Sequence, residues 1–267
     1  MATDDIAPAI VRRERLLSAI AQRGFLRVTD ASDELGVSGV TVRSDLRALE
    51  ADGEIVRVHG GAMLVRPAGN ESSFENSLEQ QGTAKRAIGR EAASLVNSGN
   101  SVLLDVGSTA LAVAHALVDR RDLTDVLVVT NGLTIALALE AAMPRFTVVV
   151  TGGTLRPLQH SLVNPFASPF LENLHTDIAF VGCNGVDAVR GVTNVNLPEA
   201  EVKRQMVISS ARPVIIADSS KLGAVSLGAI APLADVDLLI TDGGADAATL
   251  VELREAGLAV TVTDAGA

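Results

Sequence analysis

The chain has 267 residues, of which 48% are hydrophobic and 20% are charged, and its formal net charge is −10. This composition is typical of a globular protein with a large core, and it excludes a disordered, collagen-like or disulfide-rich chain. The single cysteine, Cys183, excludes an intrachain disulfide and a cysteine-rich zinc site.

The charge is distributed unevenly along the chain. Residues 1–66 carry nine arginines against ten carboxylates, whereas the remainder carries 13 basic and 22 acidic groups. Most of the chain should therefore repel nucleic acid, and only the first part is close to neutral. Neither tyrosine nor tryptophan is present, so the chain has no such platform for stacking single-stranded bases.

No segment has the pattern of a targeting signal or a membrane span. Residues 1–8 contain no basic region followed by an apolar run. Apolar runs such as Val126–Val129 have the length of strands, far below the roughly 20 residues that a spanning helix needs. Together with the lone cysteine, this favours a cytoplasmic protein that does not enter a membrane.

Two helices are predicted at the start of the chain. The first covers about 12–23 and ends before Gly24, which fits the position after a helix end. Its apolar stripe consists of Leu16, Leu17 and Ile20. A short second helix, which Thr29 or Asp30 can cap, ends at Gly36.

A third helix and a hairpin follow. Ser38 can cap this helix, which runs to about Ala51. Residues 54–65 then form two short strands around the tight turn His59-Gly60-Gly61. Three helices followed by a small hairpin are the pattern of a winged helix-turn-helix domain.

The third helix has two distinct faces when residues are placed about 100° apart on a helical wheel. The apolar face should pack on the first two helices, and it consists of Val42, Leu46 and Leu49. The opposite face fits a DNA groove, and it consists of Val40, Ser44 and Arg47, flanked by Thr41 and Arg43. An arginine can bind guanine O6 and N7 together, and Val40 can contact a thymine methyl group. An ordinary surface helix with solvated arginines is the alternative, which the surrounding order of elements disfavours.

Further residues near this face are expected to contact the DNA backbone or the minor groove. The basic ones are Arg12, Arg13, Arg15, Arg57 and His59. Ser38, at the start of the third helix, is included among the DNA-contacting residues.

Residues 67–82 are polar and contain proline, glycine, asparagine and serine, as linkers do. From residue 83 onward, near-continuous apolar strands alternate with helices, which predicts a mainly parallel sheet covered on both faces. The predicted strands are Ser101–Asp105, Asp125–Thr130, Phe146–Thr151, Asp177–Gly182, Pro213–Asp218, Val236–Thr241 and Leu258–Thr263. The predicted helices are Leu111–Leu117, Leu133–Ala142, Glu199–Ser209 and Ala247–Ala256. We therefore expect a DNA-binding domain over 1–66, a linker over 67–82 and an α/β domain over 83–267.

Polar turns follow several of these strands, at the edge where open α/β sheets bind ligands. The turn 105–109 precedes a helix and offers backbone N–H groups and hydroxyls to a phosphate. Each turn alone is ordinary turn chemistry, and only the set favours a site for an anionic ligand. Its candidate residues are Asp105, Gly107, Ser108, Thr109, Thr130, Asn131, Gly152, Gly153, Lys203 and Lys221.

Other ligand classes lack their sequence signatures. No two of the 23 glycines lie two residues apart, and no lysine follows a glycine, so neither a dinucleotide fingerprint nor a Walker A loop is present. The histidines are widely separated and show no metal-ligand spacing; they are His59, His115, His160 and His175. We therefore predict no metal site and no cofactor.

The stretch Arg15–Gly61, with VSGVTVRSDL at 37–46 and VHGGA at 58–62, resembles the DeoR family of bacterial transcriptional regulators. That family usually has a second arginine where this chain has Ser44. Later pieces resemble the family's effector domain in order and spacing, although Leu162–Pro165 lacks the family's usual glycine. These pieces are Asp105–Thr109, Thr130-Asn131, Thr151–Gly153, Glu199–Lys203 and Asp218–Lys221. The resemblance implies a Rossmann-like domain related to ribose-5-phosphate isomerase and the CoA transferases, which senses a phosphorylated sugar.

The function predicted from these features is that of a DNA-binding transcriptional regulator. We expect a repressor of carbohydrate metabolism genes that binds double-stranded operator DNA as a homo-oligomer, because two linked heads gain affinity. The alternative is a sugar-phosphate isomerase or deaminase that carries a DNA-binding module. Its candidate general bases are Asp105, Glu201 and Asp218. Since such an enzyme has no use for a DNA-binding half, we expect no catalysis.

Overall fold

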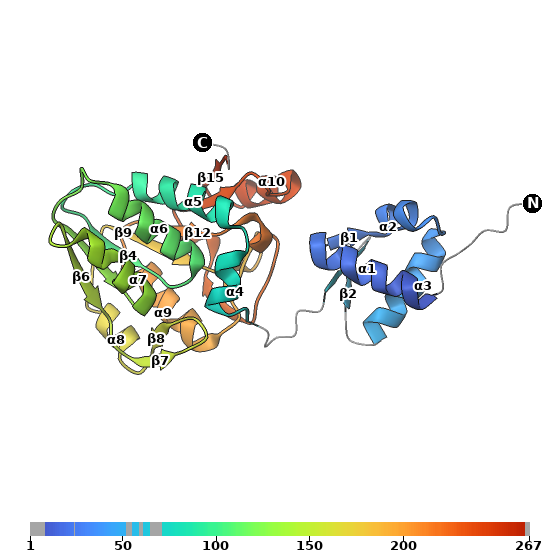
Figure 1. Cartoon of the computed structure of the whole chain (residues 1–267), viewed down its shortest axis with the longest axis horizontal. Coiled ribbons are helices and arrows are strands. Elements are labelled where there is room, and N and C mark those ends of the chain that lie inside the picture. The colour runs from blue at the N-terminus through green and yellow to red at the C-terminus, as the bar shows by residue number, and fades with distance from the viewer. Residues whose placement is uncertain (1–8, 24, 52–54, 59–60, 65–70, 265–267) are drawn as a thin grey trace, which may run out of the picture. The chain divides into compact units, whose positions relative to one another are not determined.

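The computed structural model describes residues 9–23, 25–51, 55–58, 61–64 and 71–264. The chain divides into two compact units, unit 1 (Met1–Asn70) and unit 2 (Glu71–Ala267) (Figure 1). Among the described helices, none is long and apolar enough to cross a membrane.

The described residues of unit 1 form three helices and a small antiparallel sheet of strand order β1-β3-β2. Its elements are α1 (Ala9–Arg23), β1 (Phe25–Arg27), α2 (Val28–Leu35), α3 (Gly39–Ala51), β2 (Ile55–Val58) and β3 (Gly61–Leu64). The apolar faces of the helices meet in one core, whose members include Leu16, Ile20, Val42, Leu46 and Leu49. The predicted order of three helices and two strands is confirmed.

Two details of unit 1 differ from the prediction. Strand β1 was not predicted, because three residues are too few to show a periodic pattern; it is identified by its pairing with β3. Neither Thr29 nor Asp30 caps α2, because the helix begins at Val28 and its N-cap residue is Arg27, with no side-chain hydrogen bond. Gly36 does end this helix, in the left-handed conformation with φ of 64°. The predicted roles of Gly24 and of the turn at 59–60 lie outside the described residues.

Unit 2 is built on a seven-stranded parallel sheet of order β15-β14-β12-β9-β4-β5-β6. The strands are β4 (Ser101–Leu104), β5 (Val126–Thr130), β6 (Phe146–Val150), β9 (Ile178–Gly182), β12 (Pro213–Ile216), β14 (Leu238–Asp242) and β15 (Val260–Thr263). Each observed strand end lies within two residues of its predicted position. The strands inside the sheet are largely buried valine, leucine and isoleucine residues, which is why their apolar runs could be recognised in the sequence.

The sheet of unit 2 is covered on both faces, as predicted. Alternate residues of β4 belong to two different hydrophobic cores, with Val102 and Leu104 in one and Leu103 in the other. The first core includes residues of α5, α6 and α7, and the second includes residues of α8, α9 and α10 (Figure 1). The helices are α4 (Phe74–Glu79), α5 (Gly82–Ser94), α6 (Ser108–Asp119), α7 (Leu133–Leu139), α8 (Ala167–Leu171), α9 (Leu197–Ile208) and α10 (Ala247–Glu255), with short 3-10 turns η1 (Glu140–Ala142), η2 (Ser219–Lys221) and η3 (Leu233–Asp235).

Two small antiparallel sheets in unit 2 were not predicted. One is the hairpin of β7 (Thr154–Arg156) and β8 (Ser161–Val163), and the other has the order β10-β11-β13. The strands of the second are β10 (Gly185–Asp187), β11 (Gly191–Asn194) and β13 (Gly228–Ala231). Strands of three or four residues leave too short an alternation to be recognised.

The predicted linker 67–82 was wrong for its second half. Helix α4 lies inside it, and Ser73 caps this helix by accepting a hydrogen bond from the Asn76 backbone N–H at 3.2 Å. Phe74 is 3% exposed and joins the core of unit 2. One apolar side chain in a polar stretch gives no periodic signal, yet its burial attaches the segment to unit 2.

Candidate DNA-binding and ligand-binding sites

Helix α3 exposes the residues that were predicted to face DNA. Val40 is 73% exposed, an unusual position for a valine, and Thr41 is half-buried. The remaining members of this face are exposed, and they are Arg43, Ser44 and Arg47. The opposite face is buried through Val42, Leu46 and Leu49, so packing fixes which side of α3 can meet a groove.

The start of α3 is capped as predicted. The Thr41 backbone N–H donates to Ser38 Oγ at 3.2 Å, which satisfies one of the open donors of the first turn. The two hydroxyls of Ser38 and Thr41 also lie within hydrogen-bond distance, at 2.9 Å. Both side chains therefore shape the first turn of α3.

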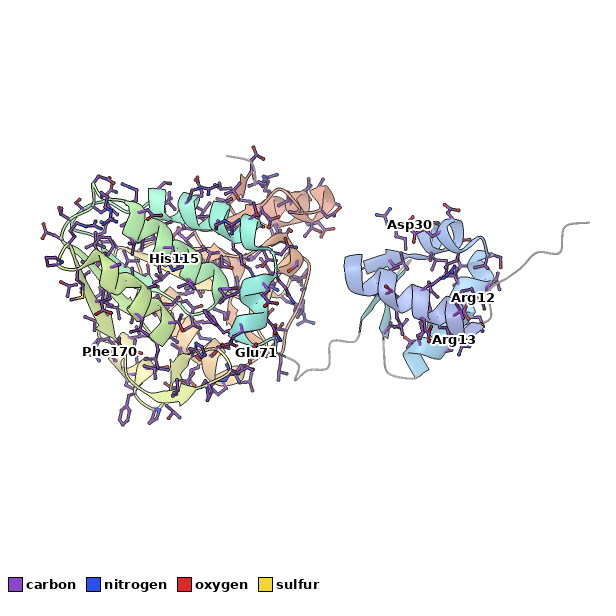
Figure 2. The ribbon with its side chains drawn as sticks, viewed as in Figure 1. Arg12, Arg13, Asp30, Glu71, His115 and Phe170 are labelled. Carbon is purple, nitrogen blue, oxygen red and sulfur yellow. The ribbon has the colours of Figure 1, made fainter. Side chains whose placement is uncertain are left out.

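Arg12 and Arg13 are neighbouring arginines on α1 (Figure 2). Their surroundings differ. Arg12 is 9% exposed and donates to both carboxylate oxygens of the buried Asp45, from Nε at 2.5 Å and from Nη2 at 3.1 Å. Arg12 thus holds α1 against α3, and this engagement disfavours the contact with phosphate that was expected of it. The Arg13 side chain is 36% exposed, and its Nε is 3.4 Å from Asp45 Oδ1. Arg13 therefore remains available at the surface.

Three other basic residues were predicted to contact the DNA backbone, namely Arg15, Arg57 and His59. Arg15 is exposed on α1. Arg57 lies in β2, but its side chain and all of His59 fall outside the described part of the chain.

In unit 2, Asp105 and Lys203 are brought together at the carboxyl edge of the sheet. Asp105 follows β4, and Lys203 lies on α9. Lys203 Nζ forms an ion pair with Asp105 Oδ2, and the Gly182 backbone N–H donates to the same oxygen at 2.9 Å. The two charged side chains are 5% and 0% exposed. Lys203 is therefore committed to Asp105.

The electrostatics of this pair follow from its burial. Burial raises the pKa of Asp105, and the charge of Lys203 opposes this rise. Burial by itself lowers the pKa of Lys203, but the charges of Asp105 and Glu199 outweigh it and raise this pKa. Asp105 Oδ1 is buried without a hydrogen-bond partner among the described residues. The carboxylate therefore has one oxygen engaged and one open acceptor.

Helix α6 begins directly beside Asp105. Its N-cap residue is Gly107, which has φ of 105° and supplies no side-chain cap. Ser108 is buried and Thr109 is half-buried in the first turn. Because no side chain caps this terminus, its backbone N–H groups and its positive dipole end are suited to an anion.

The turns after β5 and β6 are shaped by local hydrogen bonds and packing. The Gly132 backbone N–H donates to Thr130 Oγ1 at 3.0 Å, and Asn131 Nδ2 donates to the Leu162 carbonyl at 3.1 Å. Asn131 Oδ1 is a second buried acceptor for which the described residues supply no donor. Gly152 has φ of 75° and open space around it.

Gly153 lies so close to Val163 that only glycine fits there. Its φ is 126°, and a Cβ atom there would lie 2.1 Å from the Val163 carbonyl oxygen. This close approach lets the β7–β8 hairpin pack against the end of β6. Gly153 is thus explained without any contact to a ligand.

Lys221 lies in η2 and is half-buried. Its backbone N–H donates to the Asp218 carbonyl at 3.0 Å, whereas its Nζ forms no hydrogen bond or ion pair with the described residues. Cys183 directly follows β9, and its pKa depends on the charged residues around it. The residue as a whole is half-buried. Burial of its thiol raises the pKa of Cys183 to about 12. The charges of Lys203 and Lys221 lower this pKa, and the charge of Asp218 raises it. The charges of Lys203, Lys221 and Asp218 therefore all act on the Cys183 thiol.

Lys85, the remaining lysine, has a structural role. Its Nζ donates to the carbonyl of Ser77 at 2.5 Å and to that of Gln80 at 2.8 Å. Burial lowers the pKa of Lys85. The side chain fixes the end of α4 against α5.

An ionic cluster around Glu199 was missed by the sequence analysis. Glu199 is 3% exposed, and its Oε1 accepts from Arg156 Nη1 and from Ser161 Oγ, each at 2.5 Å. Arg156 also pairs with both carboxylate oxygens of Glu71. Asn196 caps α9 by accepting from the Glu199 backbone N–H at 3.0 Å, and only this cap had a local sequence signal. The partners lie too far apart in the sequence to be paired from it.

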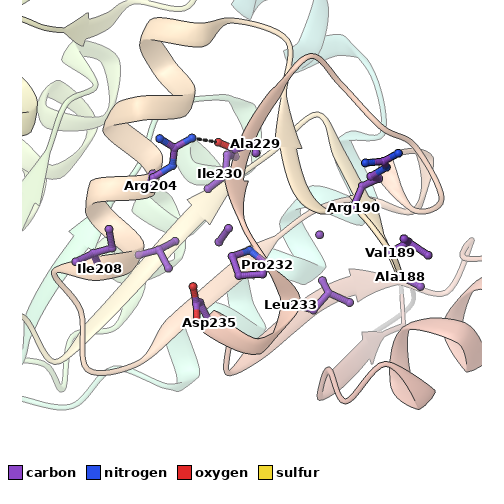
Figure 3. Close-up of a pocket in the computed structure, with 13 residues that line it drawn as sticks. Ala188, Val189, Arg190, Arg204, Ile208, Ala229, Ile230, Pro232, Leu233 and Asp235 are labelled. Atoms are coloured by element: carbon purple, nitrogen blue, oxygen red, sulfur yellow. Dashed lines mark hydrogen bonds between the residues drawn. The ribbon is translucent and has the colours of Figure 1, made fainter.

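A cavity of about 400 Å³ lies elsewhere on unit 2 and contains none of the predicted ligand-binding residues (Figure 3). Its lining comes from the second half of α9, from β13 and the following η3, and from the turn between β10 and β11. Arg204 Nη2 donates to the Ala229 carbonyl at 2.5 Å across one side of it.

Comparisons with known proteins agree with the two-part organisation. Residues 12–68 match the DeoR-like helix-turn-helix domain, and residues 80–243 match the DeoR C terminal sensor domain. The HTH-type transcriptional regulator GlpR of Haloferax volcanii is 39% identical over 95% of this chain and 96% of its own. A putative aga operon transcriptional repressor of Escherichia coli O157:H7 is 36% identical over 93% of this chain and 92% of its own.

Among solved structures, ribose 5-phosphate isomerase A of Methanocaldococcus jannaschii aligns at a TM-score of 0.38 and 19% identity. The alignment covers 51% of this chain and 52% of the isomerase. A likeness this low carries no argument about function.

Proposed function

The chain belongs to the DeoR family of transcriptional regulators, and from this premise we propose that it is a repressor of carbohydrate metabolism genes controlled by a phosphorylated sugar. In this proposal unit 1 binds operator DNA in the cytoplasm and unit 2 senses the sugar. The enzyme alternative is not favoured, because the similar full-length proteins are named as transcriptional regulators and repressors.

The observation that carries the ligand assignment is the open oxygen of Asp105. A buried acceptor without a donor costs about 1–3 kcal/mol, so Asp105 Oδ1 is suited to a ligand that donates a hydrogen bond. Asn131 Oδ1, after the neighbouring strand, is open in the same way. Two acceptors at adjacent strand ends match the hydroxyl groups of a sugar.

The phosphate of this ligand would bind at the start of α6. The N–H groups there, with Ser108 and Thr109, supply donors for an anion. Lys203 neutralises Asp105, which removes a negative charge that would otherwise repel the phosphate. Lys221 is then the cation left to balance the dianion. Gly107, Thr130, Gly152 and Gly153 would shape the surrounding turns.

On the DNA side, the exposed face of α3 would read the major groove. Arg47 and Arg43 offer bidentate contacts to guanine, and Val40 offers an apolar contact to thymine. Ser38, Thr41 and Ser44 would contact the DNA backbone, together with the basic residues Arg13, Arg15, Arg57 and His59. Because one small head on a chain of net charge −10 has little electrostatic affinity, we infer that a homo-oligomer binds symmetric half-sites.

Arg13→Ala should weaken binding to every DNA sequence to a similar extent. Arg13 is a partly exposed cation on α1, and a phosphate contact contributes to affinity without reading bases. The slope of log affinity against log salt should fall by about one unit. Gel-shift titrations of specific and unrelated duplexes at several salt concentrations measure this slope. An unchanged slope would remove Arg13 from the phosphate contacts.

The proposed function is tested by a thermal-shift screen of sugar phosphates on the full chain. A ligand that binds only the native state raises the Tm. We expect at least one sugar phosphate to raise it and to change the affinity for operator DNA. If no sugar phosphate did either, while the chain still bound its operator, the sensing half of the proposal would be refuted.

A further inference from the structure

The first residues of unit 2 are held by an arginine that also holds α9. Arg156, on β7, forms a bidentate pair with Glu71 and donates through Nη1 to Glu199 Oε1 at 2.5 Å. The three side chains are 8%, 19% and 4% exposed for Glu71, Arg156 and Glu199. One guanidinium therefore links the start of unit 2 to α9 in a largely buried cluster.

The β7–β8 hairpin, residues 154–163, makes further contacts with residues 71–75, which we call the entry segment. Gln159 Nε2 donates to the Ser72 carbonyl at 2.6 Å, and the Phe74 backbone N–H donates to the Leu158 carbonyl at 2.9 Å. His160 completes the contact, with its ring centroid 5.1 Å from that of Phe74 and its Nε2 3.2 Å from Glu75 Oε1. The entry segment is the part of unit 2 to which the chain from unit 1 connects.

The other side of the same hairpin contacts the turns proposed to hold the ligand. The Leu162 backbone N–H donates to the Asn131 carbonyl at 2.7 Å, and Asn131 Nδ2 donates back to the Leu162 carbonyl. The Leu133 backbone N–H donates to the His160 carbonyl at 3.0 Å. Ser161 Oγ donates to Glu199, which lies one helical turn before Lys203.

We propose that the β7–β8 hairpin couples the ligand site to the entry segment, with Arg156 and Glu71 as its positioning residues. The inference rests on the proposed function, since it assigns the route by which an occupied site reaches the DNA-binding half. A ligand that orders Asn131 or shifts α9 changes the position of the hairpin, and the hairpin carries the entry segment with it. The coupling is reciprocal, so a change at the entry segment also changes the turns that are proposed to hold the ligand.

The hairpin is suited to this role because it is short and is held mainly by polar contacts. Thr154 and Leu155 are exposed, and the apolar burial of the hairpin comes from Leu162 and Val163 of β8. Elements with few buried apolar contacts open at low free energy while the rest of the fold stays closed. The seven-stranded sheet, with two apolar cores, provides the fixed frame against which the hairpin moves.

The coupling is tested without any ligand by hydrogen exchange on the full chain. Glu71→Gln keeps the shape of the side chain and removes its charge, which weakens the pair with Arg156. We expect amide exchange to rise about tenfold in 71–79, and also in 131–135 and 161–163 at the far side of the hairpin. Exchange in β12 should stay unchanged, which shows that the fold is intact. A rise confined to 71–79 would overturn the proposal.

Two further variants complete the test. Asp122→Asn is the control, because it weakens another arginine pair of unit 2, with Arg120, that does not touch the hairpin; it should leave all three segments unchanged. Gln159→Ala removes only the Gln159–Ser72 contact and should raise exchange in the same three segments by a smaller factor. No change in 131–135 with this variant would also count against the coupling. The absence of sugar-phosphate binding in the thermal screen would refute the proposed function but would leave these exchange results to decide the coupling.

Discussion

Lys203→Met is expected to lower the free energy of unfolding by about 3–5 kcal/mol, because it leaves the charge of Asp105 buried and uncompensated. Lys203 and Asp105 are 4% and 0% exposed, so water cannot replace the lost partner. Because the chain contains neither tryptophan nor tyrosine, urea unfolding is followed by circular dichroism.

The loss should depend on pH. Burial raises the pKa of Asp105 in the folded state, and without Lys203 nothing in the pair opposes this rise. A carboxyl group whose folded pKa exceeds its unfolded pKa favours the folded state below the unfolded pKa, and this contribution disappears as pH rises through the folded pKa. The variant's deficit should therefore be smaller at acid pH than at neutral pH.

The double variant Asp105→Asn with Lys203→Met is the control for this prediction. It removes both charges, so it should be more stable at neutral pH than Lys203→Met alone. A single variant as stable as the parent at neutral pH would show that the ion pair does not form in solution.

Arg47→Ala is expected to weaken binding to the operator by about 1–3 kcal/mol while its effect on unrelated DNA stays small. Arg47 is exposed on the face of α3 opposite the buried Leu46 and Leu49. Its removal therefore leaves the packing of unit 1 intact. Gel-shift titrations of operator and unrelated duplexes measure the two affinities.

The matched control for Arg47→Ala is Arg86→Ala. Arg86 is an exposed arginine of α5 in unit 2, so this variant removes the same charge away from α3. It should bind the operator like the parent. Equal operator affinity of Arg47→Ala and the parent would remove Arg47 from the residues that read bases.

The elements that the sequence analysis predicted are those with strong local patterns. The seven parallel strands are short apolar runs, and those inside the sheet are largely buried. Helix α3 shows a clear periodic contrast between buried Leu46 and exposed Arg47. Helix α4 and strand β1 were missed because each depends on partners elsewhere in the chain. For α4 that partner is the core that receives Phe74.

The sequence indicated which residues belong to the candidate site, but it did not indicate which of them form ion pairs or hydrogen bonds with one another. Polar turns after strands indicated Asp105 and Asn131, and the small number of lysines drew attention to Lys203. That Lys203 neutralises Asp105 depends on the packing of α9 against the sheet, which brings together residues 98 positions apart. For the same reason, the sequence gives no way to distinguish the roles of the adjacent Arg12 and Arg13. The structure distinguishes them, because Arg12 is bound to the buried Asp45.

The central claim is that unit 2 recognises the phosphate group of a sugar ester. It is tested most directly by calorimetric titration of the full chain with the sugar phosphate selected in the thermal screen and with the corresponding free sugar. The same two titrations are repeated with Lys221→Ala. The account predicts that the ester binds the parent more tightly than the free sugar does, and that Lys221→Ala removes most of this preference. Equal affinity of the parent for the sugar and its ester would contradict it.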